Sequence, residues 1–289
     1  MKTLFAASAS LVALTALAAA APASAQEVEI RNAVARVVVI PEDRSDIAVE
    51  IERGTAALPA IQVRRRGNDV RIDGDLPRNA FRNCSDERDG ARQPGEGASV
   101  EVRGHGRIEL SAAPLVVIRT PRDVDVSAGG AVFGSVGRGA SSIELGSGGC
   151  GAWTVANTTG TMQLAVGGSG SIRAGTSGRL KASVGGSGSI STGATRDLEA
   201  AVGGSGGIRV ARVDGDAEVS IGGSGDVSVR DGSTGRFEVA IGGSGDVSYG
   251  GTTRDLKVAI AGSGDVRVGA ATGQVERAVV GSGTVTIGR

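Results

Sequence analysis

The sequence has few aromatic residues, one histidine and no excess of either charge. Of its 289 residues, four are Phe, one is Trp and one is Tyr, while 31 Lys and Arg balance 31 Asp and Glu. Binding to nucleic acids relies on clustered cations and on rings that stack on bases. The one basic run, Arg64 to Arg66, would alternate between the two faces of a strand, so we interpret it as a solvated strand end. The composition therefore speaks against a nucleic-acid-binding protein.

Long hydrophobic runs are also missing, except at the start of the chain. Lys2, an apolar stretch over residues 4–21 and the small residues Ala23-Ser24-Ala25 are typical of a secretory signal peptide. We predict cleavage after Ala25, so that residues 1–25 are removed and the mature chain is exported to the periplasm or the cell surface. No later segment reaches the length of about 18 apolar residues that a membrane helix needs, so we expect no transmembrane segment in the mature chain. A retained N-terminal anchor is the alternative.

Residue patterns for catalysis are scarce as well. A serine nucleophile needs a base beside it, and the only histidine, His105, lies between two glycines in polar surroundings, which favours an exposed loop. The glycine-rich segments lack the lysine and the following helix of a phosphate-binding loop. We therefore predict no catalytic residue, no cofactor-binding residue, no metal ligand and no enzymatic activity.

Glycine, with 49 residues, is the abundant residue type, and much of it belongs to one repeat. The triplet Gly-Ser-Gly recurs at spacings of 18 to 20 residues, centred on Ser169, Ser187, Ser205, Ser224, Ser244, Ser263 and Ser282. An earlier, poorer copy is centred on Ser147. A fixed repeat of this length is typical of a solenoid, in which each unit buries its apolar face against its neighbours.

Apolar residues keep the same place in every repeat. The positions three before and three after each serine are all Val or Ile, and those seven before and five after are mainly apolar. This period of two predicts two short strands joined at a glycine bend, with the apolar side chains turned inward. Rungs about 4.8 Å apart would then share a continuous core. Glycine is expected at the bend because a side chain there would collide with the next rung or require a positive φ.

The serine of each triplet, and the residue two positions after it, would point outward. The predicted exposed ladder consists of Ser169, Ser187, Ser205, Ser224, Ser244, Ser263 and Ser282, with Asp226, Asp246 and Asp265 beside them. Calcium binding by the aspartates is an alternative, because hard cations prefer several oxygen ligands, but we favour simple solvation. Arg277 interrupts an otherwise apolar inward column in the last repeat, and we interpret it as a cap that keeps the open end unpaired.

The chain before the repeats is rich in strands but lacks the period. We assign residues 26–125 to an N-terminal β region that continues or caps the solenoid, with a polar loop at 78–104, and residues 126–289 to the Gly-Ser-Gly repeat. Strands are expected at 34–40, 47–51, 61–63, 70–72, 108–110 and 115–118. Cys84 and Cys150 are the candidate disulfide of an exported protein, and two separate thiols are the alternative.

Several motifs resemble a known family. Residues 115–121 read LVVIRTP and lead into VDVSAGG at 124–130, and Gly-Ser-Gly-Asp-Val is complete around Gly225, Gly245 and Gly264. Together with the opening strands, these features resemble the bacterial auto-transporter adhesins of the head GIN domain family, a domain of unknown function. The resemblance implies a right-handed parallel β-helix, an exported location and an adhesive role, and it brings no catalytic residues with it.

Together, these patterns favour an all-β, right-handed parallel β-helix, or β-solenoid, with repeats of roughly 19 residues. We predict an exported, non-enzymatic, adhesin-like or cell-envelope interaction protein, with glycan, peptidoglycan or an envelope protein as candidate partners. A purely structural envelope protein is one alternative. A polysaccharide-active β-helix enzyme is the other, in which carboxylates of the aspartate column would act as acid and base. Such an enzyme would need rings for sugar binding, and only Trp153 and Tyr249 are candidates.

Overall fold

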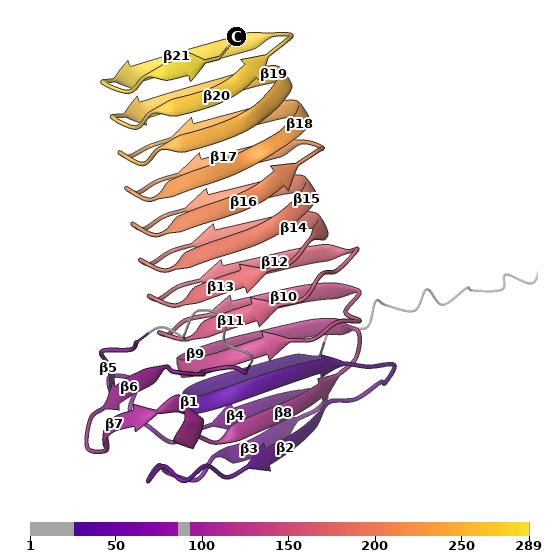
Figure 1. Ribbon diagram of the computed structural model, residues 1–289, viewed down its shortest axis with the longest axis vertical. Helices are drawn as coiled ribbons and strands as arrows, with labels where there is room; N and C mark the ends of the chain where they lie inside the picture. The colour runs from indigo at the N-terminus through magenta and orange to yellow at the C-terminus, as the bar shows by residue number, and fades with distance from the viewer. Residues whose placement is uncertain (1–25, 86–92, 289) are drawn as a thin grey trace, which may run out of the picture.

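The computed structural model describes residues 26–85 and 93–288, and the predicted signal peptide lies outside them. The described chain is an all-β solenoid of about nine turns with a spacing of about 19 residues, which confirms the predicted fold class. The turns stack into a tall column, with β1 near the base and β21 at the top (Figure 1). The described part contains no α-helix, and hence no helix long and apolar enough to cross a membrane.

One long parallel sheet, here the pre-corner sheet, collects the strands that precede each glycine corner. From the base upward it contains β4 (Asp69–Asp73), the first half of β1 (Glu27–Pro41), the first half of β9 (Asp123–Val136), β10 (Ser142–Ser147), β12 (Thr161–Val166), β14 (Ser177–Val184), the second half of β15 (Ser189–Val202), β17 (Ala217–Ile221), the second halves of β18 (Asp226–Ile241) and β19 (Val247–Gly262), and β21 (Val275–Gly281).

A second parallel sheet, the post-corner sheet, collects the strands that follow each corner. It contains β8 (Leu115–Thr120), the second halves of β1 and β9, β11 (Ala152–Val155), β13 (Ser171–Ala174), the first half of β15, β16 (Gly207–Val213), the first halves of β18 and β19, β20 (Val266–Ala271) and β22 (Val285–Ile287). Five strands belong to both sheets: the chain stays extended through the corner in β1 and β9, and through the second bend of the turn in β15, β18 and β19.

The base of the column ends in antiparallel strands. β2 (Ala48–Glu52) pairs with β8, and β3 (Gln62–Arg66) pairs with β4, both antiparallel. The N-terminal region therefore continues the solenoid through β1, β4 and β8 and then closes both sheets. The first rungs begin well before residue 126, since β1 pairs along most of its length with β9.

The core is built from columns of apolar side chains that lie in register on successive rungs. Ile221, Ile241 and Ile260 lie in register on neighbouring rungs, and each is about 2% exposed. Parallel pairing without a shift places each residue opposite its counterpart in the next rung, so β-branched side chains stack on one another. Each fully buried Val or Ile contributes about 1.5–3 kcal/mol relative to an exposed one.

The glycine corners allow the rungs to approach closely. The carbonyl oxygen of Gly186 accepts the backbone N–H groups of Ser205 and Gly206 in the next rung, at 3.1 and 3.0 Å. A Cβ atom on Gly204 would collide with that same oxygen. Of the glycines that flank the seven repeat serines, Gly281 is the one with a positive φ. Close approach of the backbone, and not a left-handed conformation, is therefore the reason for glycine at these corners.

A small antiparallel sheet covers the outside of the first turns, beside β9 and β11 (Figure 1). It consists of β5 (Phe81–Arg82), β6 (Ser99–Val102) and β7 (Gly106–Glu109), followed by a single 3-10 turn at Leu110–Ala112. The segment 78–104, expected to be a polar loop, thus contains two strands. Val100 and Leu110 from this side sheet pack with Val34, Ala131 and Phe133 of the solenoid in a second buried cluster.

The outward columns change character where the side sheet ends. Val34 and Ala131 occupy the corner position in the covered turns, whereas Ser169 and its successors occupy it above them. The next outward column changes in the same way, from Phe133 to Ser171. Apolar side chains are required where a second layer packs on the solenoid, and hydroxyl side chains suit the turns that face water.

The expected early copy of the triplet at Ser147 was wrong by three residues. Ser147 pairs with Val166 and is 3% exposed, so it belongs to an inward column. The true corner of this turn is Gly149-Cys150-Gly151, with Cys150 in the place of the serine. Cys150 forms a disulfide with Cys84, just after β5, with 6.0 Å between the Cα atoms. The cysteine at the corner therefore fastens the side sheet to the solenoid.

The top of the column is uncovered in the part of the chain that the structure describes. All seven residues of β21 are exposed, and Val280 is 75% exposed. Arg277 pairs in register with Val258 and so takes an inward place in this last rung. Its role as a cap against edge pairing stays a prediction.

Replacing a corner glycine should destabilise the solenoid far more than replacing the serine beside it. In Gly245→Ala the new methyl group would overlap the carbonyl oxygen of Gly225, and such overpacking costs about 1–3 kcal/mol. The matched variant Ser244→Ala removes an exposed hydroxyl and should change the free energy of unfolding by less than about 0.5 kcal/mol. Urea unfolding followed by circular dichroism compares the two, and equal losses would contradict this explanation of the corner.

Removing the disulfide should loosen the side sheet and leave the upper turns intact. Cys84 and Cys150 are 66 residues apart in the chain, so the double variant Cys84→Ser/Cys150→Ser loses a restraint of about 2–4 kcal/mol. Amide hydrogen exchange should become faster in β6 and β7 but stay slow in β18 and β19, which open separately. Unchanged protection of β6 and β7 would mean that apolar packing alone holds the side sheet.

Candidate functional site

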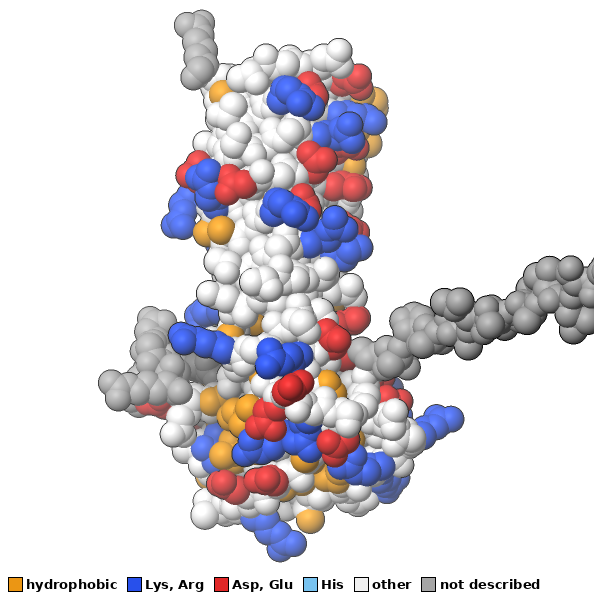
Figure 2. Space-filling model, turned by 90° about the vertical axis from the view of Figure 1, so that its right-hand side faces the viewer, with side chains coloured by type: hydrophobic (Ala, Val, Ile, Leu, Met, Phe, Trp, Pro, Cys, Tyr) orange, Lys and Arg blue, Asp and Glu red, His pale blue; other side chains and the backbone are white. Residues whose placement is uncertain are grey.

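The outer surface of the column carries charges of both signs close together. Figure 2 shows red and blue side chains side by side along the shaft, separated by white areas of other side chains and backbone. Ion pairs join neighbouring rungs, such as Lys181 with Glu199 at 2.8 Å and Arg212 with Asp231 at 2.9 Å. Exposed pairs contribute only about 0–1 kcal/mol each, but they do neutralise much of this surface.

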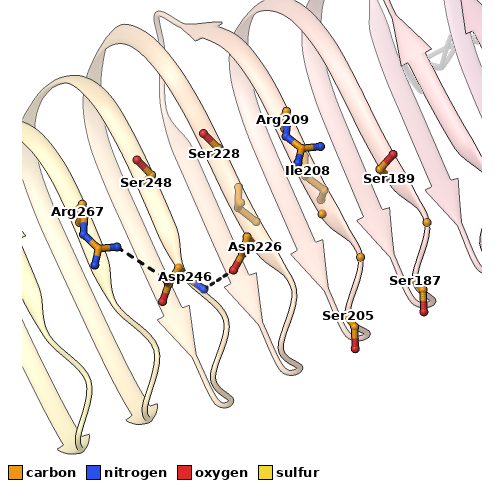
Figure 3. Close-up of a pocket in the computed structure, with 14 residues that line it drawn as sticks. Ser187, Ser189, Ser205, Ile208, Arg209, Asp226, Ser228, Asp246, Ser248 and Arg267 are labelled. Carbon is orange, nitrogen blue, oxygen red and sulfur yellow. Dashed lines mark hydrogen bonds and ion pairs between the residues drawn. The ribbon is translucent and has the colours of Figure 1, made fainter.

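The repeat serines form one exposed column along the corner edge, which consists of Ser169, Ser187, Ser205, Ser224, Ser244, Ser263 and Ser282. None of their hydroxyl groups has a hydrogen-bond partner among the described residues. Their backbone N–H groups are engaged instead, as in the 3.1 Å bond from Ser224 to the carbonyl oxygen of Gly204. Ser187 and Ser205 stand at the tips of their bends (Figure 3). The edge thus presents free hydroxyls about 4.8 Å apart on a firmly bonded backbone.

The three aspartates lie in one column at the start of the post-corner strands, where they bond the rungs together. Asp226 Oδ1 accepts the backbone N–H of Asp246 at 2.9 Å (Figure 3). In the same way, Asp246 Oδ1 accepts the backbone N–H of Asp265 at 2.8 Å. Asp265 Oδ1 accepts both the backbone N–H and the hydroxyl of Thr284, at 3.0 and 2.7 Å. The hydroxyl bond is the main cause that lowers the pKa of the Asp265 carboxyl. Sequence reasoning favoured simple solvation of these aspartates and did not predict that they bond neighbouring rungs.

A shallow hollow opens on the post-corner sheet below the aspartates. Gly207 lies in register between Ser189 and Asp226, so the column has no side chain at this point. The hollow has a volume of about 480 Å³. Its walls include Ser187, Ser189, Ser205, Arg209, Asp226 and Ser228 (Figure 3). With Asp246 and Arg267 further up, hydroxyls, two carboxylates and two guanidinium groups therefore surround the place where Gly207 leaves the column without a side chain.

Two arginines of the same outward column line this hollow and differ in their bonding. Arg267 lies 3.0 Å from Asp265 and 3.6 Å from Asp246, measured between nitrogen and oxygen. Arg209 is exposed and has no hydrogen bond or ion pair within residues 26–85 and 93–288. All the donor groups of the Arg209 guanidinium are therefore available to a ligand.

Sequence reasoning predicted the serines and aspartates but missed Gly207 and Arg209. A signal for the hollow was present, because the column two residues after each serine has one glycine among Ser171, Ser189, Asp226, Asp246, Asp265 and Thr284. No sequence feature showed that Arg209 would lack a carboxylate neighbour, since ion pairing depends on which side chains the stacking brings together.

The two rings that could have served as sugar platforms are buried in the core. Trp153 is 1% exposed and fills the space that Gly134 leaves. Tyr249 is 2% exposed, packs against Phe237 with 5.0 Å between ring centres, and donates its hydroxyl to the carbonyl oxygen of Thr252 at 3.1 Å. Neither ring reaches the surface, so a ligand on the post-corner sheet must be held by polar contacts.

His105 and the ladder serines lie on different parts of the fold. His105 lies in the turn between β6 and β7, and its Nδ1 atom is 2.8 Å from the carbonyl oxygen of Ala57. The side sheet covers the first turns, below the turn of Ser169. Among the described residues no group of three or more His, Cys, Asp and Glu is arranged to hold a metal ion.

A second polar feature, an acidic column, lies on the pre-corner sheet near the base. Glu27, Asp125 and Glu144 are opposite one another on neighbouring strands, and Asp69 accepts the backbone N–H of Glu27 at 3.2 Å. Burial, followed by repulsion from Glu144, Glu27 and Asp69, raises the pKa of Asp125 to about 6. The neighbouring carboxylates of this column thus destabilise the charged form of Asp125.

Comparison with known proteins identifies one family in the upper part of the column. Residues 211–288 match the family described as "Putative auto-transporter adhesin, head GIN domain". The matched stretch includes the last four Gly-Ser-Gly corners and all three aspartates of the column. It confirms, for these residues, the family resemblance inferred from the repeat. No curated protein matches the chain.

The acidic column predicts a specific pH dependence of stability. The Asp125 carboxyl has a folded-state pKa of about 6, above its unfolded value of 3.8, so its favourable contribution is present below pH 3.8 and is lost as the pH rises to about 6. We expect Asp125→Asn to stabilise the protein at pH 7 by about 1 kcal/mol, allowing for solvent screening, and to have little effect near pH 4. Urea unfolding at both pH values checks this, and a pH-independent effect would contradict it.

Proposed function

We propose that the protein is an exported, non-enzymatic, adhesin-like interaction module of the cell envelope, which binds its partner along the corner edge and the post-corner sheet. The hollow at Gly207 carries this proposal, because it is a polar recess in a surface that is otherwise a regular ladder. The family match over residues 211–288 supports the adhesin-like class and an extracellular or surface location. The signal-peptide pattern of residues 1–25 supports export.

The rigidity of the surface supports a role in binding. Every ladder serine is attached to the rung below through its backbone, and the aspartates add a further bond between rungs. A surface that is already ordered loses little conformational entropy when a ligand docks, so more of the contact energy appears as affinity. A repeated array also permits several weak contacts to act together on one extended partner.

The chemistry of the same surface favours binding over cleavage. A glycosidase needs a general acid with a raised pKa and a second carboxylate in a different environment. The pKa of Asp265 is lowered, and the aspartates of the column share one structural task, as acceptors of backbone N–H groups. Trp153 and Tyr249 are both buried, so neither can position a sugar ring for hydrolysis.

The test is a binding screen with the mature chain, residues 26–289, against immobilised glycans, peptidoglycan and envelope proteins, with and without a calcium chelator. We expect retention of one ligand class that the chelator does not abolish. Retention of nothing would favour a purely structural envelope protein, and release of reducing sugar from a glycan would favour the polysaccharide-active enzyme.

A labelling experiment then locates the binding surface. Ser205→Cys, coupled to a bulky maleimide, places the label at the edge of the hollow, and Glu218→Cys with the same label is the matched control on the pre-corner sheet. Both side chains are exposed and have no bonded partner in the described chain. Binding should fall at least tenfold for the first label only. Equal effects would contradict the post-corner location.

A further inference from the structure

The hollow at Gly207 has a chemical character that narrows its ligand. Its donor side is the free guanidinium of Arg209, which carries a full positive charge and five N–H groups in a planar fork. Guanidinium forks bind carboxylates and phosphates in bidentate fashion, and these are stronger contacts than bonds between neutral groups. An anionic group is therefore the natural partner for this side of the hollow.

The acceptor side of the hollow requires a ligand that also donates hydrogen bonds. Asp226 uses one oxygen for the N–H of Asp246, which leaves its other carboxylate oxygen without a partner in the described chain. Ser189, Ser205 and Ser228 add hydroxyls that have no bonded partner there. A simple anion would be repelled by Asp226, whereas a molecule with both an acid group and hydroxyl groups would satisfy both sides.

From this combination we infer that the hollow binds an acidic sugar unit, with its carboxylate or phosphate group on Arg209 and its hydroxyl groups on Asp226 and the neighbouring serines (Figure 3). The inference rests on the proposed interaction function and names its ligand class. A neutral sugar would leave Arg209 without a counter-charge, and the buried Trp153 and Tyr249 offer it no stacking surface. The Asp and Glu side chains of an acidic peptide would bring only acceptors to the hollow, so backbone N–H groups alone would face Asp226 and the serines, whereas a sugar acid offers several hydroxyl donors on one ring.

The surroundings of the hollow favour a polymer over a single sugar. Arg173 lies in the same outward column two rungs below Arg209, which corresponds to a separation of about 10 Å along the column. Arg230 lines an adjoining depression that shares Arg209, Ser228 and Ser248 with the hollow. Neither Arg173 nor Arg230 has a bonded partner among the described residues. An acidic polysaccharide that runs along the column would thus meet three free guanidinium groups.

The experiment is isothermal titration of the mature chain with three polymers. Polygalacturonate supplies carboxylates, phosphomannan supplies phosphates, and dextran is the neutral control. We expect binding of at least one acidic polymer, weaker at higher salt, and no binding of dextran. Stronger binding of polygalacturonate would assign a carboxylate to the site, and stronger binding of phosphomannan would assign a phosphate. Either result supports the inference. Dextran binding as strong as that of the acidic polymers would overturn it.

Variants then test the position of the contact. Arg209→Gln should weaken binding of the acidic polymer about tenfold, because a charge-assisted contact is lost. Arg138→Gln removes the same charge from another exposed arginine, in the turn after β9, which also has no bonded partner in the part of the chain that the structure describes, and it should leave the affinity unchanged. Equal weakening by the two variants would show that binding follows net charge, and it would overturn the inference.

A third variant fills the hollow without touching an arginine. Gly207→Asp continues the aspartate column and places a carboxylate beside Arg209. The affinity for the acidic polymer should therefore fall more than tenfold. A Cβ atom there would lie 3.3 Å from the carbonyl oxygen of Asp226, which is tight, so a thermal melt must first show a folded column. If this variant unfolds, the comparison of Arg209→Gln with Arg138→Gln alone tests the position of the contact.

Failure of this inference and failure of the proposed function give different results. If no acidic polymer binds, but the earlier screen retains an envelope protein or a neutral glycan at the post-corner sheet, the acidic-sugar assignment is wrong and the interaction function stands. If neither experiment finds a ligand, both are overturned.

Discussion

The hydrogen bonds between successive glycine corners are the constraint on which the rest of the structure depends. The oxygen of Gly186 accepts two N–H groups from the next rung, and this approach leaves no room for a Cβ atom on Gly204. Because the corners are fixed at the rung spacing, both sheets stay in register, and each side chain stacks on its counterpart in the next rung. The core of aligned Val and Ile residues and the outward ladder of serines follow from the same register.

The same register explains the difference between the base and the shaft. In the first turns the outward columns carry Val34, Ala131 and Phe133, and the side sheet covers them. Cys150 takes the corner place at the upper border and ties that sheet down through Cys84. Above this point the columns become Ser169 and Ser171, which face solvent. One backbone geometry thus serves a packed layer below and an open, polar surface above.

A regular surface gains specificity where its regularity is interrupted. Along the aspartate column each carboxylate is used by the backbone of the next rung, so most of the ladder is occupied with its own structure. Gly207 lies at the lower end of that series, between Ser189 and Asp226, and Arg209 beside it has no bonded partner among the described residues. The recess therefore combines a fixed backbone with unused donors and acceptors, which is the combination that lets a binding site form without rearrangement.

The sequence by itself determined the repeat, the inward and outward columns and the need for glycine at each corner, because a period of two in a stacked solenoid depends only on local alternation. Strands such as β1, β2, β4 and β8 were also expected close to where they lie. Only the tertiary structure decided that β5 and β6 lie over Val34 and Phe133, and that Cys150 and not Ser147 marks a corner. It also decided that Asp226 bonds the next rung while Arg209 has no bonded partner in the described part of the chain. These outcomes depend on which residues the register brings together across rungs. The contacts between side chains of different rungs cannot be derived from the residue spacing within any one repeat.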